Sequence, residues 1–231
     1  MKKIVVIHQP DFLSYIGFFH RLLYADLYII LDDVQFVKSN NSWTHRDKIK
    51  TKNTEQWLTL SVQKAQRNTH INKILLSNDI HWKVKNLNLI KENYKKSEFF
   101  EEIFPYIEKL YSNTDNKLCS FNIKSILLLL ELFDIKIKME YSSSLKTFNA
   151  KSEKIVEILT KVNATHYLSG IGAKNYHNNQ PFDDANIEVL WQNFEHPIYN
   201  QINGEFIPYL SSIDLFFNCG IKKSREILRS I

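Results

Sequence analysis

The segment KIVVIHQPDF at residues 3–12 decides the fold, together with IGFFHRLL at residues 16–23 and LYIILDD at residues 27–33. The β-branched run of the first segment predicts a strand that is buried on both faces. Pro10 ends that strand because proline has no N–H donor. The second segment has its apolar residues at helical spacing, and the third predicts another strand. Strand, helix and strand make a βαβ unit, whose crossover places the two strands in parallel.

Polar side chains follow both predicted strands at the points where they end. These are His8, Gln9, Asp11, Asp32, Asp33 and Gln35. In open parallel sheets, ligands bind beyond the carboxyl ends of the strands. Turn formation is the alternative for the aspartates, since Asp and Pro end many strands, but His and Gln are not typical turn residues. The pattern therefore favours a ligand site at this edge of the sheet.

The composition is that of a globular protein. The chain has 231 residues, of which 44% are hydrophobic and 24% charged, and we expect one domain over residues 1–231. The net charge of +5 comes from scattered lysines, which predicts no nucleic-acid footprint but a weak attraction for anionic substrates. Cys119 and Cys219 have neither metal nor disulfide spacing, so both are expected to be reduced thiols on apolar helical faces.

No apolar run in the chain is long enough to span a bilayer, and no signal peptide is evident. We therefore expect a cytoplasmic protein. The histidines and cysteines show no metal-ligand spacing, and neither a nucleophile elbow nor a phosphate-binding loop of the Walker type is present. No cofactor is evident, and a homo-oligomer is compatible with the sequence.

The remaining chain alternates between helical and extended patterns. Strands are predicted at 56–62, 135–141, 165–168 and 187–191, with a further short one at 71–76, and helices at 81–94, 97–111, 115–133, 152–162, 206–218 and 222–231. Pro105 is expected to kink or split its helix. Asp115 or Asn116 and Ser152 are expected as helix caps. The sequence thus predicts an α/β fold with a parallel-sheet, Rossmann-like core from residues 1–62 and 135–231 and a helical insertion or cap at about 81–133.

Two further segments supply candidate binding residues. The polar segment 34–50, which contains Trp43, His45 and Arg46, is too irregular to assign to a helix or strand. Its position just after Asp32 and Asp33 favours a binding loop over a merely solvated one. Gly170 and Gly172 follow a predicted strand, where glycine lets backbone N–H groups approach an anion. A third glycine in register is missing, so a dinucleotide site is not indicated, and a tight turn is the alternative.

The candidate residues also match the pattern of a known family. The matching stretches are Ile7–Pro10, Ile16–Phe19, Leu31–Phe36, Ser42–Trp43, Trp57–Thr59, Tyr167–Gly170, Ser211–Asp214 and Phe217–Gly220. Through them the chain resembles the WbqC-like protein family over nearly its whole length. It departs at Ser14–Tyr15, where Pro-Trp is expected, and at Thr44–His45, where Gln-Asn is expected.

The resemblance implies a transferase of bacterial surface-polysaccharide (lipopolysaccharide O-antigen) biosynthesis that transfers an acyl or aminoacyl group to a nucleotide-linked amino sugar. Its partners would be the nucleotide-linked sugar and an acyl donor. His8 would deprotonate the amine, Asp32 or Asp33 would hold it, with Asp33 the catalytic candidate, and the remaining polar residues would bind substrate. These binding residues are Gln9, Asp11, Asp32, Gln35, Trp43, His45, Arg46, Gly170, Gly172, Tyr176 and Asn193.

Two alternatives remain open. One is a nucleotidyltransferase or ATP-dependent ligase of the same pathway, with Lys222, Lys223 and Arg225 near the phosphates. The other is a non-catalytic ligand-binding protein.

Overall fold

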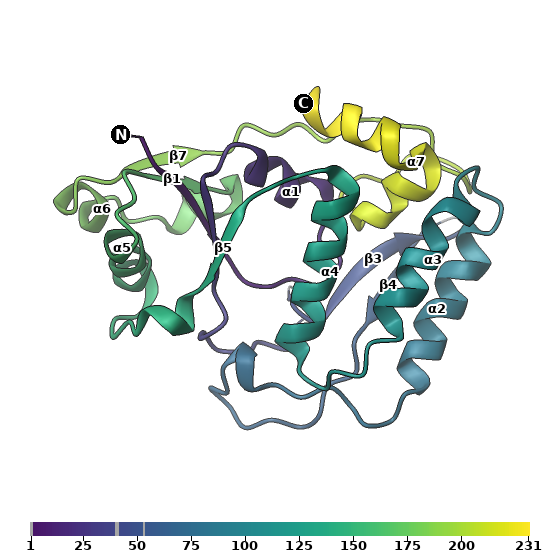
Figure 1. Ribbon diagram of the computed structural model, residues 1–231, viewed down its shortest axis with the longest axis horizontal. Coiled ribbons are helices and arrows are strands. Elements are labelled where there is room, and N and C mark those ends of the chain that lie inside the picture. Colours follow the sequence, from purple (N-terminus) through teal and green to yellow (C-terminus); the bar gives the residue numbers. More distant parts are fainter. Residues whose placement is uncertain (1, 40–41, 53) are drawn as a thin grey trace.

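A five-stranded parallel sheet forms the centre of the molecule, in the order β5-β2-β1-β6-β7 (Figure 1). The computed structural model describes residues 2–39, 42–52 and 54–231, apart from the side chains of Asn175 and Tyr176. The strands are β1 (Ile4–His8), β2 (Leu27–Ile30), β5 (Lys138–Tyr141), β6 (His166–Ser169) and β7 (Glu188–Trp191). Counted along the chain, this order is 3-2-1-4-5, that of a Rossmann-like sheet. The predicted α/β class is confirmed.

Helices cover both faces of the sheet, because β1 has apolar side chains on both of its faces. Val5 packs in one cluster with residues of α5 (Lys151–Lys161) and α6 (Gln180–Asp184). Val6, the next residue, points to the opposite face and packs in the second cluster with residues of α1 (Ile16–Leu23). The alternation of successive side chains along a strand thus builds both clusters from one short segment.

The chain changes direction across the sheet between β1 and β6. From β1 it proceeds through β2 to β5 on one side, and then returns to place β6 and β7 on the other side. The helix that follows β1 and the helix that follows β6 consequently lie on opposite faces. The loops at the carboxyl ends of these two neighbouring strands diverge, and such a switch point is where open α/β sheets bind ligands.

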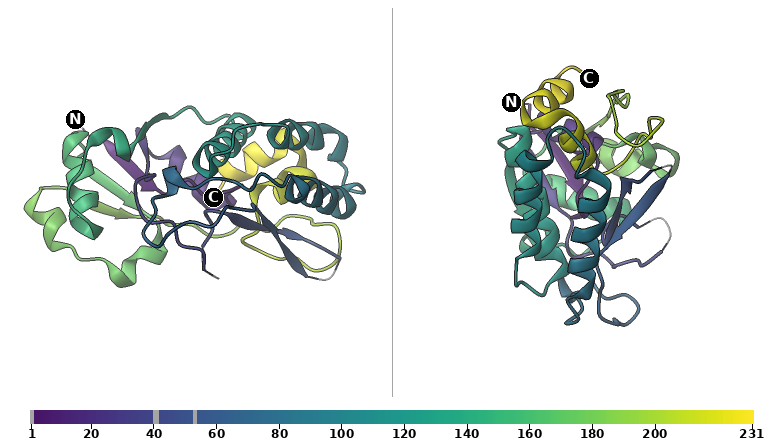
Figure 2. Two further views of the ribbon diagram at one scale, coloured as in Figure 1. Left: turned by 90° about the horizontal axis from the view of Figure 1, so that it is seen from below. Right: turned by 90° about the vertical axis from the view of Figure 1, so that its right-hand side faces the viewer.

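The predicted central helices form a side layer beyond one end of the sheet. They are α2 (His81–Tyr94), α3 (Phe100–Tyr111) and α4 (Leu118–Phe133). Figures 1 and 2 show α2 and α3 at the end of the molecule opposite α5 and α6. α3 continues through Pro105 as one helix, so the expected split is wrong. The helix tolerates proline here because its apolar face is buried in the core.

The last helix, α7 (Ser212–Arg229), packs against α1, α3 and α4. It joins the helices predicted at 206–218 and 222–231 across a kink at Gly220, which has φ 70° and ψ 173°, but residues 206–211 are not helical as predicted. A Cβ atom at Gly220 would lie 2.6 Å from the ring of Phe99, so both the backbone conformation and the close packing require glycine.

A separate antiparallel hairpin, β3 (Arg46–Lys50) and β4 (Glu55–Thr59), lies beside the main sheet. The expectation that the parallel sheet is built from residues 1–62 and 135–231 is therefore wrong for the segment 46–59. β3 was not predicted because its charged residues Asp47 and Lys50 are buried. The Lys50 ammonium donates to Gln201 Oε1 (3.0 Å) and to the backbone oxygen of Gly204 (3.1 Å). Such distant polar partners leave no trace in the local sequence pattern.

Three smaller expectations are also wrong. Residues 71–76 begin with a short 3₁₀ helix, η1 (Ile71–Lys73), where a strand was predicted. The N-caps of α4 and α5 are Lys117 and Ala150, and neither cap has a side-chain hydrogen bond. Two other 3₁₀ helices, η2 (Ser142–Leu145) and η3 (Ile171–Tyr176), follow β5 and β6.

Within the described part of the chain, no helix has the length and apolarity to cross a membrane.

Candidate functional site

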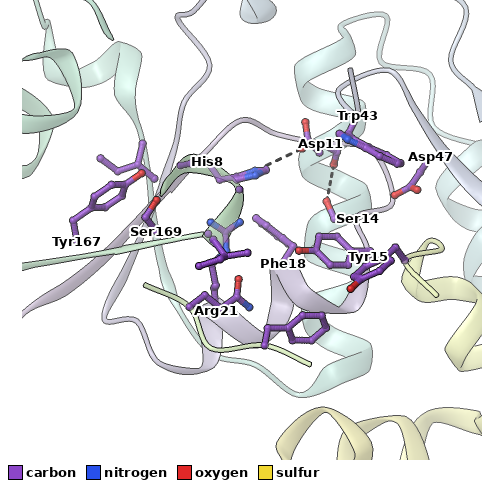
Figure 3. Close-up of a pocket in the computed structure, with 18 residues that line it drawn as sticks. His8, Asp11, Ser14, Tyr15, Phe18, Arg21, Trp43, Asp47, Tyr167 and Ser169 are labelled. Atoms are coloured by element: carbon purple, nitrogen blue, oxygen red, sulfur yellow. Dashed lines mark hydrogen bonds and ion pairs between the residues drawn. The ribbon is translucent and has the colours of Figure 1, made fainter. Parts of the chain in front are cut away.

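A cavity of about 550 Å³ opens at the carboxyl ends of β1 and β6, the switch point of the sheet (Figure 3). Its walls come from the end of β1, the loop to α1, α1 itself, β3, and the turn after β6. The side chains that carry chemical groups into it are His8, Asp11, Ser14, Tyr15, Arg21, Trp43, Asp47, Tyr167, Ser169, Gln192 and Tyr209.

The loop between β1 and α1 is held in place by the helical layer. Leu13 is buried and has a positive φ of 44°, a conformation that is rare for a branched side chain. Its backbone oxygen accepts a 2.6 Å hydrogen bond from the Ser211 hydroxyl. The buried Asn122 amide donates to the backbone oxygens of Pro10 (2.6 Å) and Thr44 (2.5 Å). α4 and the start of α7 therefore fix the loop that carries Asp11.

His8 ends β1 and is held as a neutral imidazole. Burial, and then the positive charge of Arg21, lower its pKa to about 3. Its Nδ1 lies 2.9 Å from the backbone oxygen of Gln9 and 3.7 Å from Asp11 Oδ2. A neutral ring next to a carbonyl oxygen carries its proton on Nδ1, so Nε2 is left as a hydrogen-bond acceptor. His8 is 30% exposed in its side chain, which leaves it accessible from the cavity.

Asp11 is the carboxyl group of the cavity that titrates near neutral pH. Burial raises its pKa to about 7, against the opposing effects of a hydrogen bond from Thr44 and the charge of Arg21. The Thr44 hydroxyl donates to Asp11 Oδ1 at 3.2 Å. A group with a pKa near the working pH is well suited to accept and return a proton.

A second acidic residue of the cavity, Asp47, was missed by the sequence analysis. It lies on β3, is buried, and accepts a 2.6 Å hydrogen bond from the backbone N–H of Lys48. Burial raises its pKa well above the ordinary range, and the neighbouring charge of Asp11 raises it further. Asp47 therefore holds a proton more readily than an ordinary aspartate, and its protonated form can donate a hydrogen bond into the cavity. Without a predicted strand at 46–50, no signal distinguished it from a solvated charge.

Arg21 was also missed, because the segment 16–23 was interpreted only for its apolar helical spacing. Its side chain reaches the cavity from α1 and is only 6% exposed. The guanidinium carbon lies 5.9 Å from the centre of the Phe18 ring. Figure 3 shows Arg21 on the side of the cavity opposite Trp43 and Asp47.

Aromatic rings form much of the remaining wall. Tyr15 packs edge-on against Phe194 with ring centres 6.0 Å apart, and its ring centre lies 6.2 Å from that of Tyr209. A Cβ atom at Gly17 would lie 2.4 Å from the Tyr15 ring, so glycine is needed for the ring to fold back along α1. Trp43, which is 39% exposed, also lines the cavity.

The structure brings together only some of the predicted site residues. His8, Asp11, Trp43, Gly170 and Gly172 line the cavity, whereas Gln9, Asp32, Asp33, Gln35, His45, Arg46 and Asn193 do not. The side chain of Tyr176 lies outside the described residues. The expectation that His8 and Asp33 share a pocket is therefore wrong.

The two aspartates after β2 have partners elsewhere. Asp33 forms a 2.7 Å ion pair with Lys154 of α5, and Asp32 accepts hydrogen bonds from Ser143 (2.8 Å) and Asn72 (2.9 Å). These contacts, together with a hydrogen bond from Ser142 to Asp33, hold the segment after β2 against η1, against η2 after β5 and against α5. The physical reason is topological, because β2 neighbours β5, and the sheet opens on the other side of β1.

Other predicted binding residues serve the packing around the hairpin. The Gln9 amide oxygen accepts a 3.1 Å hydrogen bond from Thr44. His45 is buried, and burial lowers its pKa to about 4. The Arg46 guanidinium lies over the Trp57 ring at 4.0 Å and donates to the backbone oxygen of Ser39 at 3.1 Å.

Gln35 and Asn193 are exposed and lie outside the cavity wall. Lys222, Lys223 and Arg225, the residues of the ligase alternative, lie on α7 and do not reach the cavity. Arg225 Nε donates instead to the backbone oxygen of Leu132 at 2.7 Å.

No group of three or more His, Cys, Asp or Glu side chains comes together as a metal site would, as far as residues 2–39, 42–52 and 54–231 are concerned. Both cysteines are free, with Cys119 buried and Cys219 half-buried. The side chains that the cavity offers are thus acid–base groups, one cation and aromatic rings.

Comparison with known proteins adds a family and one relative. The model of the WbqC-like protein family matches residues 9–226. A protein of Mycobacterium tuberculosis, described as the uncharacterized protein Rv1507c, is 28% identical over 222 residues, which are 95% of this chain and 95% of that protein. No solved structure matches the chain at a significant level. The family match covers the whole wall of the cavity except Ile7 and His8.

Proposed function

The chain belongs to the WbqC-like protein family, and from the groups in its cavity we propose that it transfers an acyl or aminoacyl group to the amine of a nucleotide-linked amino sugar. The observation that carries this proposal is Asp11, a carboxyl group with a pKa of about 7 beside the neutral His8. The setting, biosynthesis of bacterial surface polysaccharide in the cytoplasm, is supported by what the family resemblance implies.

Acyl transfer to an amine needs a base, because a protonated amine has no lone pair. In the proposed reaction the Asp11 carboxylate takes a proton from the ammonium group of the sugar. The freed amine attacks the carbonyl carbon of an acyl thioester or ester and forms the new C–N bond. The bond from the carbonyl carbon to the thiolate or alkoxide then breaks, and the leaving group departs with its electron pair. The amine nitrogen gives up a second proton as the amide forms. Of the two protons released, Asp11 passes one to the leaving group and the other goes to solvent.

This assignment exchanges the roles expected from the sequence. His8 was the expected base, but a pKa of about 3 makes it a weak one at neutral pH. Its Nε2, for which none of the described residues provides a hydrogen bond, is free to accept one from the substrate amine. His8 thus orients the nucleophile, and Asp11 moves the proton.

The rest of the cavity suits a sugar. The faces of Trp43 and Tyr15 offer apolar surface for the C–H side of a pyranose ring, as aromatic side chains do in many binding sites. The carboxyl of Asp47, whose pKa burial raises, adds a hydrogen-bonding group for a sugar hydroxyl and, in its protonated form, a donor for the carbonyl oxygen of the acyl donor.

Mass spectrometry tests the proposal. The protein is incubated with a nucleoside-diphosphate-linked amino sugar and a panel of acyl thioesters and aminoacyl esters. We expect the sugar to gain the mass of one acyl group, and Asp11→Asn to lower the rate by about 100-fold or more. Asp115→Asn, a change of the same chemistry at a residue that does not line the cavity, should retain the wild-type rate.

Binding of the sugar nucleotide without acyl transfer from any donor class would overturn the reaction and leave a ligand-binding protein. Full activity in Asp11→Asn would overturn the assignment of the base.

A further inference from the structure

The cavity contains a buried cation that the proposed reaction does not use. Arg21 is 94% buried, since only 6% of its surface is exposed. Its Nε atom is buried without a hydrogen-bond partner. No ion pair joins its guanidinium to any carboxylate within the part of the chain that the structure describes. A folded protein rarely buries a charge without a partner, because the lost hydration is not replaced.

We propose that Arg21, beside Gly170, forms a subsite for an oxyanion of the ligand, a phosphate or a carboxylate. The guanidinium has five N–H donors in a planar fork and matches two oxygens of such a group at once. The assignment deepens the proposed function, on which it rests for treating the anion as part of a substrate. The binding itself is measured without turnover.

Gly170 leaves the space that Arg21 occupies. A Cβ atom at this position would lie 3.2 Å from Nη1 and 3.6 Å from Cζ of Arg21. The φ of Gly170 is −72°, which every residue adopts, so its backbone does not require glycine. Because Gly170 has no side chain, the guanidinium can approach the turn after β6 closely.

The other ionisable groups of the cavity do not cancel the charge. His8 is neutral, Asp11 is only partly ionised at neutral pH, and burial raises the pKa of Asp47, which disfavours its negative charge. The positive charge of Arg21 acts on both His8 and Asp11, lowering the pKa of each. Phe18 lies 5.9 Å from the guanidinium and is apolar, so the fork has no protein acceptor on that side. An anionic group of the ligand would complete the site.

Thermal unfolding of the full chain in different sodium salts tests this subsite. Phosphate, pyrophosphate and acetate are compared with chloride at equal ionic strength, which separates a phosphate preference from a carboxylate preference. We expect phosphate, pyrophosphate or acetate to raise the melting temperature of the wild type more than chloride does. Arg21→Met should weaken binding of that anion by roughly tenfold or more, the loss expected for a charge-assisted hydrogen-bond pair.

Two further variants keep the test decisive. Gly170→Ala retains the charge but crowds the guanidinium, so it should also weaken the response, even if Arg21→Met does not fold. Arg225→Met removes a positive charge whose guanidinium already donates to backbone oxygens outside the cavity, and its anion response should equal that of the wild type.

An equal anion response in the wild type, Arg21→Met and Gly170→Ala would overturn the subsite, as would the absence of any response beyond that of chloride. If the anions bind through Arg21 but no acyl transfer is found, only the proposed reaction fails. If acyl transfer is found and Arg21→Met responds like the wild type, only the subsite fails.

Discussion

Replacing Asp11 by Asn should stabilise the protein at alkaline pH while it removes activity. In the folded chain the pKa of Asp11 is about 7, against an ordinary value of 3.8. Because the folded state binds this proton more tightly than the unfolded state, the carboxyl favours the fold fully below pH 3.8. That contribution is lost as the pH rises towards 7. A difference of about three pKa units corresponds to roughly 4 kcal/mol, and this is an upper limit for a side chain that is 14% exposed.

Asparagine resembles the neutral acid in shape and keeps an oxygen that accepts from Thr44. Urea unfolding at pH 4, 6 and 8 should therefore show nearly equal stability of Asp11→Asn and the wild type at pH 4, and an advantage of the variant of up to about 4 kcal/mol at pH 8. Asp115→Asn provides a control of opposite sign, since hydrogen bonds from Lys117 and Ser120 hold the pKa of Asp115 below its ordinary value. A stability difference between Asp11→Asn and the wild type that does not change with pH would refute the reasoning.

Three other predictions concern the frame of the site. Asp33→Asn breaks the ion pair with Lys154 and should cost about 2 kcal/mol in urea unfolding, whereas an unchanged stability would show that the pair contributes little. Asn122→Leu leaves two buried backbone oxygens without a donor, so it should lower the free energy of unfolding by about 2–4 kcal/mol and also lower the rate of acyl transfer. Stability and transfer rate equal to those of the wild type would show that Asn122 does not hold the loop. Burial raises the pKa of the Cys119 thiol to about 12 and that of Cys219 to about 11, so both should react slowly with a disulfide reagent at pH 8 until the protein unfolds; rapid labelling of the folded chain would count against their burial.

The sheet could be predicted because its signals are local. β1 and β2 are short runs of β-branched and apolar residues, and the helix between them shows its spacing within 16–23. His8 could be placed at the strand end for the same reason. That β6 lies beside β1 could not be predicted, because this pairing joins residues more than 150 positions apart in the sequence.

The two missed residues, Asp47 and Arg21, are charged side chains that are buried, although charged residues are usually exposed. Asp47 occurs in a charged segment that resembles a solvated loop, and Arg21 occurs in an apolar helix that resembles plain core. Conversely, Arg46 has the sequence context of a binding residue, but its guanidinium packs on Trp57. Burial of a charged side chain depends on tertiary contacts, which residue type and spacing do not encode.

The central claim is that the amine of a sugar substrate binds beside Asp11 at the switch point of the sheet. A crystal structure of the protein soaked with a nucleoside-diphosphate-linked amino sugar tests it most directly. We predict the amine within hydrogen-bond distance of the Asp11 carboxyl and His8 Nε2. A sugar bound with its amine away from both, for instance beside Asp33 and Lys154, would contradict the account.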